Sequence, residues 1–191
     1  MSANTAVKLT RDQAFKKLTE LIDNQNLIKH CLAVEMAMKS YANHFNIPEE
    51  ERETWAIAGL LHDADWEKFP DKHPNIIITW LKEQGASEEL TNAVAAHGFN
   101  FNVEAKSLMA KTLRAVDELT GLIVAVALVK DKKLANVSVE SIKKKWKDKT
   151  FAKGVNRNDI VRGAQEINRS LDEHIALVLA AMQDHAGEIG L

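Results

Sequence analysis

Residues 55–63 read Trp-Ala-Ile-Ala-Gly-Leu-Leu-His-Asp, an apolar stretch that ends in the adjacent polar pair His62 and Asp63. Pro48 and the three glutamates after it predict a helix that runs to about His62, because proline and acidic residues favour the first helical turn. Neighbouring residues of a helix point about 100° apart, so an adjacent His and Asp bind one ion most easily where the helix ends. The proline-containing connection that follows predicts such an end.

Helical periodicity also dominates the rest of the chain, and convincing alternating strand patterns are absent from the sequence. The sequence predicts further helices over about 10–22, 26–41, 76–85, 87–97 and 104–130, and two more from Asn158 and Ser170 to about His185. We therefore predict an all-α, single-domain helical bundle over residues 1–191, with a core of about 26–130 and a C-terminal helical extension of about 131–191.

Composition limits the classes of partner. The chain has 191 residues, 46% hydrophobic content and a formal net charge of -2, which favours one globular domain and gives no general attraction to nucleic acid or anionic membranes. The single Cys31 excludes an intramolecular disulfide and is expected to be a small buried packing residue. No secretory leader opens the chain, and the apolar run Leu119 to Val129 is shorter than the roughly 20 residues that span a bilayer. We expect a cytoplasmic protein without a membrane partner.

Two further polar residues lie on predicted apolar helix faces. His30 lies among Leu27, Cys31 and Val34, and Asp117 lies between Val116 and Leu119. Burying a lone carboxylate costs several kcal/mol, so Asp117 requires a metal, a basic partner or a proton. Taken singly, His30 could be an ordinary core histidine and Asp117 could pair with Arg114. Taken together with His62 and Asp63, these residues favour a divalent metal site.

The order His30, His62-Asp63, Asp117 resembles the signature of the HD-domain metal-dependent phosphohydrolase superfamily. Residues 58–63 (Ala-Gly-Leu-Leu-His-Asp), 115–122 (Ala-Val-Asp-Glu-Leu-Thr-Gly-Leu) and 147–152 (Lys-Asp-Lys-Thr-Phe-Ala) resemble a bacterial HDIG-like subgroup, and the resemblance covers about Asn26 to Ile167. Ala64-Asp65 follows the doublet where many relatives have Ile-Gly. We expect this departure to change the shape of the loop and to leave metal ligation intact.

The resemblance implies a set of metal ligands. His30, His62, Asp63 and Asp117 would hold one divalent ion, with Mn, Fe, Mg, Co, Ni and Zn all compatible with the ligand types. His73 and His97 occupy the positions of the histidines that hold a second ion in two-metal relatives, with Asp63 bridging. The alternatives are an exposed loop residue or helix cap for His73, and a cation at a helix C-terminus for His97.

The resemblance also implies hydrolysis of a small phosphate ester, with nucleotides among the candidates, by water that the metal activates. The candidate catalytic residues are Asp63, Asp65, Glu67 and Lys68. Of these, Asp65 and Glu67 are candidates for orienting the water or protonating the leaving group. Lys68, Lys111 and Arg114 are candidates for holding phosphate. A solvated loop is the alternative for Glu67 and Lys68, and an ordinary ion pair is the alternative for Lys111 and Arg114.

Two other functions stay open at this point. Some proteins that resemble this superfamily use six ligands to hold two irons and activate dioxygen, and others are non-catalytic signalling or interaction modules. The basic run Lys143 to Lys149, which contains Trp146, could contact nucleic acid, but its spacing favours the solvated face of an amphipathic helix. Lys153 and Arg157 are further candidate phosphate contacts. His174 and His185 are expected at the surface, and no sequence feature indicates an oligomeric state.

Overall fold

The computed structural model describes residues 9–191, and this range contains helices and no strands, which confirms the all-α prediction. The α-helices are α1 (Arg11–Leu21), α2 (Gln25–His44), α3 (Glu49–Leu61), α4 (Asn75–Glu83), α5 (Glu88–Ala95), α6 (Leu108–Leu128), α7 (Val139–Trp146), α8 (Arg157–Glu166), α9 (Leu171–Asp184) and α10 (Ala186–Ile189). Short 3-10 turns are η1 (Pro70–Lys72), η2 (Phe99–Phe101) and η3 (Leu134–Asn136). Thr10 begins α1 with the predicted capping box, and Ser87 caps α5.

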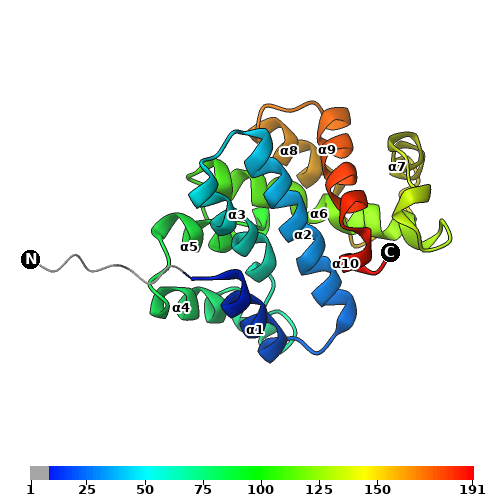
Figure 1. Cartoon of the computed structure of the whole chain (residues 1–191). Coiled ribbons are helices and arrows are strands. Elements are labelled where there is room, and N and C mark those ends of the chain that lie inside the picture. The colour runs from blue at the N-terminus through cyan, green and yellow to red at the C-terminus, as the bar shows by residue number, and fades with distance from the viewer. Residues whose placement is uncertain (1–8) are drawn as a thin grey trace, which may run out of the picture.

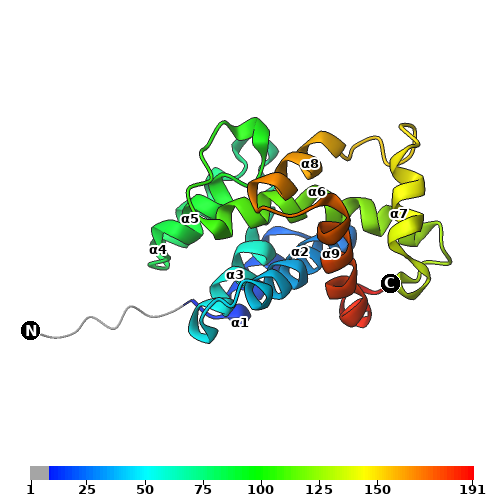
Figure 2. The same ribbon diagram turned by 90° about the horizontal axis from the view of Figure 1, so that it is seen from above.

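The long helices α2, α3 and α6 form the centre of the molecule (Figure 1). Helices α2 and α3 pack closely because Gly59 has no side chain: a Cβ there would lie 2.8 Å from the backbone of Val34 and Glu35. Figure 2, seen from above, shows α6 running lengthwise over this pair, with α8 beside it and α7 at its far end. The three central helices therefore bring the segments that carry His30, His62 and Asp117 to one place.

A second close approach joins α6 to α8. A Cβ on Gly163 would lie 2.6 Å from the Cα of Ala115, so only glycine permits this spacing. Ala115 lies two residues before Asp117, and α8 carries Asp159 near its start. The contact thus sets where α8 stands relative to the candidate site.

The predicted helix from Glu104 begins later than expected. Ser107 caps α6 by accepting a hydrogen bond from the backbone N–H of Ala110. The preceding residues are held outside the helix by Asn92, whose side chain donates to the carbonyl of Glu104 and accepts from the N–H of Lys106. A hydrogen bond between distant segments has here overridden a continuous helical pattern.

The prediction of an exposed His174 is wrong. Its side chain is fully buried, and the Tyr41 hydroxyl donates to its Nδ1 at 2.6 Å while its Nε2 donates to the carbonyl of Ala115 at 2.9 Å. Burial lowers the pKa of His174 to about 4 against the opposing effect of the Ala115 carbonyl. His174 therefore joins α9 to α2 and α6 as a neutral ring with both nitrogens satisfied.

Other expectations hold. Cys31 is buried in the core. Ile142 buries one side of α7 while Lys143 and Lys144 are exposed, as the amphipathic interpretation predicted. Among the described residues, no helix combines the length and the apolar character needed to cross a membrane. The division into a core and a C-terminal extension stays a prediction.

Candidate metal centre

Six side chains from separate parts of the chain meet at the centre of the bundle. His30 comes from α2, His62 and Asp63 directly follow α3, and Asp117 comes from α6. His73 lies in the connection before α4, and His97 follows α5. They fall into two groups of three whose ligand atoms lie within 4.8 Å of one another.

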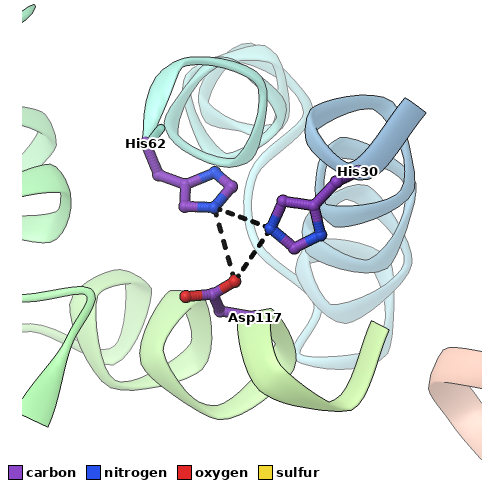
Figure 3. Close-up of side chains that lie close together, drawn as sticks. All are labelled: His30, His62 and Asp117. Carbon is purple, nitrogen blue, oxygen red and sulfur yellow. Dashed lines mark hydrogen bonds and ion pairs between the residues drawn. The ribbon is translucent and has the colours of Figure 1, made fainter. Parts of the chain in front are cut away.

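The first group consists of His30, His62 and Asp117 (Figure 3). His30 Nε2 lies 3.0 Å from Asp117 Oδ1 and 3.2 Å from His62 Nε2, and His62 Nε2 lies 3.4 Å from Asp117 Oδ1. Ligands about 2.1 Å from one ion are separated by roughly 3.0 to 3.5 Å, so this triangle has the dimensions of a metal shell.

The second group consists of Asp63, His73 and His97. Asp63 Oδ1 lies 3.4 Å from Nε2 of both histidines, which are 3.3 Å from each other. The other oxygen, Oδ2, lies 3.5 Å from His62 Nε2 and 3.7 Å from His30 Nε2. Asp63 thus presents one oxygen to each group, the arrangement of a carboxylate that bridges two ions.

Hydrogen bonds behind the rings orient the histidines. His62 Nδ1 donates to the carbonyl of Gly59 at 2.7 Å, and His97 Nδ1 donates to that of Val94 at 2.6 Å. His73 Nδ1 instead donates to the carboxylate of Asp65 at 2.6 Å. In all three rings Nδ1 is held away from the site and Nε2 faces it, which is the orientation that metal ligation requires.

The carboxylates give the site a preference for positive charge. Burial acts to lower the pKa of His62, but Asp63 and Asp117 outweigh it and raise the pKa to about 9. Burial likewise acts to raise the pKa values of Asp63 and Asp117, and His62 and the neighbouring imidazoles hold both below their usual range. Neutral nitrogen and anionic oxygen donors around one point suit a divalent cation such as Mn, Fe, Co, Ni or Zn.

A cavity of about 200 Å³ opens onto the two groups. Asp63, His73, His97 and Asp117 line its floor, and Arg114, Glu118 and Asp159 line its walls. The aromatic residues Trp66, Phe99 and Phe101 also line the cavity, together with Gly98 and Asn100. Phe101 lies with its ring centroid 4.9 Å from that of His97 and 5.5 Å from that of His73. The metal groups are therefore open to a small ligand on one side and screened by aromatic rings on another.

The structure places Asp65 and Glu67, two candidate catalytic residues, outside the lining of the metal cavity. Asp65 is fully buried, and both its oxygens are used, one by His73 and the other by the backbone N–H of Ile77 at 2.9 Å. Glu67 accepts from the N–H groups of Asp23 and Asn24 at the start of α2. Neither residue lines the cavity.

Of the candidate phosphate contacts, Arg114 alone lines the metal cavity. Lys68 donates to the carbonyl of Glu20 at 2.8 Å and does not line the cavity. Arg114 lines the cavity and pairs with Glu166 at 2.7 Å, so the alternative pairing with Asp117 is not observed. Lys111 lies in an adjoining cavity. Arg157 donates to the carbonyls of residues 146, 148, 151 and 155 and so holds its own loop, and Lys153 lies near it.

Sequence reasoning missed several residues of the cavity wall. Phe99 and Phe101 lie between two predicted helices, and Asp159 is an acidic residue in the first turn of a helix, so neither position carries a sequence signal for a binding site. Trp66 follows the doublet closely and is 49% exposed at the cavity. Only its proximity to His62 and Asp63 in the sequence could have indicated it.

Comparison with known proteins gives one match. A family model described as HD domain matches residues 27–122, a range that contains all six side chains of the two groups. No curated protein and no solved structure matches the chain. The HDIG-like subgroup stays a prediction. Because the match spans half of the chain and includes every candidate ligand, the chain belongs to the HD-domain family, whose members are typically metal-dependent hydrolases.

Proposed function

We propose that the chain is a metal-dependent phosphohydrolase that cleaves a small phosphate ester, with nucleotides among the candidate substrates. One observation carries the proposal: Asp63 directs one oxygen to His30 and His62 and the other to His73 and His97. Asp63 would therefore be able to serve as a ligand in both groups, which meet at one open cavity. Two-metal sites of this kind are common in enzymes that displace groups at phosphorus.

The donor set fits divalent ions, and His30, His62, Asp63 and Asp117 would hold the first while Asp63, His73 and His97 would hold the second. A divalent ion held there lowers the pKa of a coordinated water toward neutrality and stabilises negative charge on phosphoryl oxygens. The protein contributes preoriented imidazoles and a cavity that places the ester against them.

Two wall residues have the right position to act on the ester. Arg114 provides a permanent positive charge beside the floor of the cavity and would hold a phosphoryl oxygen. Asp159 lines the same cavity, and burial raises the pKa of its carboxyl although Arg162 and Arg114 oppose this. We propose that Asp159 donates a proton to the leaving oxygen, the role first considered for Asp65 and Glu67.

The test begins with metal-stripped protein reconstituted with Mn, Fe, Co, Ni, Zn or Mg. Phosphate release is measured over a panel of phosphate monoesters and nucleotides. We expect release that depends on one or more of these metals and is lost in His62→Ala. Absence of phosphate release from every ester by the fully loaded protein would overturn the proposal.

An oxygenase with two irons is the second candidate, because the histidine pair His73 and His97 completes a six-ligand site. Iron as the predominant metal of freshly purified protein, with oxygen consumption and no phosphate release, would favour it. A non-catalytic HD module is less well supported because all six candidate ligands are retained. Binding to a partner protein without any metal would favour that alternative. The cytoplasmic location stays a prediction.

A further inference from the structure

A second cavity adjoins the metal centre and has a different chemical character. Its volume is about 550 Å³, and three basic side chains, Lys111, Arg114 and Arg162, contribute to its lining. The acidic residues of the lining are Glu104 and Glu166. Three cations against two carboxylates leave an excess of one positive charge, whereas the metal cavity is lined by four carboxylates and one arginine.

Two residues belong to both cavities. Phe99 and Arg114 line the metal cavity and also the basic cavity, so they form the wall between them. A ligand that extends past this wall can place one end at the histidines and the other among the basic residues. The two cavities can therefore act as two parts of one binding site.

The wall is built around a stacked ring. The guanidinium carbon of Arg114 lies 4.2 Å from the centroid of Phe99, and that of Arg162 lies 4.1 Å from the same centroid. Glu166 contacts both arginines, Arg114 Nη2 at 2.7 Å and Arg162 Nε at 3.5 Å. Stacking and ion pairing fix the two guanidinium planes in advance, which reduces the entropy lost when they bind an anion.

Arg114 also carries an unsatisfied polar atom. Its side chain is 9% exposed, and its Nε is buried without a hydrogen-bond partner. Leaving a buried N–H unsatisfied is unfavourable, and such groups in native proteins call for an explanation such as a functional role. Arg114, which carries this unsatisfied Nε, lines both cavities.

We propose that the basic cavity is a subsite for a second anionic group of the substrate, which is therefore a phosphate ester that also carries a phosphate or a carboxylate. The phosphoryl group to be cleaved would lie at the metal centre, and the second anion would lie between Lys111 and Arg162. The assignment of the first anion rests on the proposed function. The existence of the second subsite rests on the basic cavity itself.

The test uses ligands that cannot be hydrolysed. Alkane-α,ω-bisphosphonates of increasing chain length, the corresponding monophosphonates and ω-carboxyalkylphosphonates are titrated calorimetrically into the metal-loaded full chain. We expect one chain length at which the doubly anionic ligand binds at least tenfold more tightly than the monophosphonate. Whichever of the two second groups, phosphonate or carboxylate, gives the larger gain identifies the preferred anion.

The key variant is Arg162→Gln. The side chain of Arg162 is 61% exposed, so the fold should tolerate the change. It should reduce the advantage of the doubly anionic ligand about tenfold. Lys82→Gln is the matched control because Lys82 lines a separate cavity, and it should keep the full advantage. Thermal unfolding checks that each variant is folded, and Lys111→Gln repeats the test if Arg162→Gln is not.

An equal affinity for singly and doubly anionic ligands at every chain length would overturn the inference. An undiminished advantage in folded Arg162→Gln, or in Lys111→Gln where Arg162→Gln is unfolded, would also overturn it. These outcomes are separable from a failure of the proposed function. If no ester is hydrolysed but the chain-length preference persists and is sensitive to Arg162, the second subsite stands and the hydrolase proposal falls. If monoesters are hydrolysed but no chain-length preference is found, the hydrolase proposal stands and the second subsite falls.

Discussion

The carboxylate of Asp65 lies 2.6 Å from Nδ1 of His73, and its second oxygen accepts the backbone N–H of Ile77 at 2.9 Å. His73 lies in the connection before α4, outside any regular α-helix. Asp65 compensates by tying the ring to the start of α4. A carboxylate behind an imidazole also makes the opposite nitrogen a stronger donor.

Asp65→Asn should therefore weaken the second metal position. An amide keeps the shape but loses the charge, and its NH2 group would face either the ring N–H or the N–H of Ile77. We expect the affinity at the His73 and His97 position to fall about 10- to 100-fold while the first ion stays bound. Elemental analysis and metal titration measure this, and Asp71→Asn, a change at an exposed site in the same connection, should leave both ions in place.

The bridging position of Asp63 gives a different pattern of metal loss. Because its two oxygens face both groups, Asp63→Ala should lower the content of both ions. His97→Ala removes one ligand of the second group alone and should leave one ion per chain. Identical metal contents in the two variants, measured on untagged protein purified without added metal, would rule out the bridge.

Asp159→Asn tests the proposed proton donor. The change removes an acidic proton from the cavity wall but no ligand, so kcat should fall about 100-fold with the metal content unchanged. Asp172→Asn is the control, since Asp172 lies on α9 and is exposed. A loss of metal in Asp159→Asn, or an unaltered kcat, would remove Asp159 from the mechanism.

Much of the metal centre could be predicted from the sequence because each ligand type carries a local signal. His62 and Asp63 end an apolar helix, and His30 and Asp117 are polar residues on apolar faces. The wall of the cavity carried no such signal. Arg114 and Arg162 are separated by 48 positions and meet only through Phe99 and Glu166, a contact that depends on how α6 packs on α8.

His174 illustrates the same limit for the core. From the sequence alone, a single histidine on an apolar helix face can be either exposed or buried. Its hydrogen-bond partners decide which. Tyr41 and the carbonyl of Ala115 are far away in the sequence and satisfy both ring nitrogens. Glu67 and Lys68 show the opposite case. Their closeness to the doublet suggested catalysis, but Lys68 bonds to the end of α1 and Glu67 bonds to the segment that follows it.

Gly59 and Gly163 should be sensitive to the smallest possible substitution. A Cβ at either position would lie within 3 Å of backbone on the neighbouring helix, and backbone cannot move aside easily. We expect Gly59→Ala and Gly163→Ala each to lower the free energy of unfolding by about 1 to 3 kcal/mol. Gly187→Ala is the control, because Gly187 is also helical and a Cβ there meets no atom within 4 Å. Chemical denaturation compares the three, and equal stabilities would contradict the close packing.

The buried ring of His174 should make stability depend on pH. Its pKa is about 4 in the folded protein, below the ordinary value of 6.5, so the unfolded chain binds the proton more readily. The stabilising effect of the neutral ring is thus complete above about pH 6.5 and is lost as the pH falls toward 4, with a total of about 3 kcal/mol. His174→Gln should be less stable than the parent at pH 7 and should lose less stability than the parent between pH 7 and pH 4.5. His185→Gln is the control because His185 is partly exposed at the end of α9. If the parent and His174→Gln lose the same free energy over this range, the acid sensitivity arises at other groups.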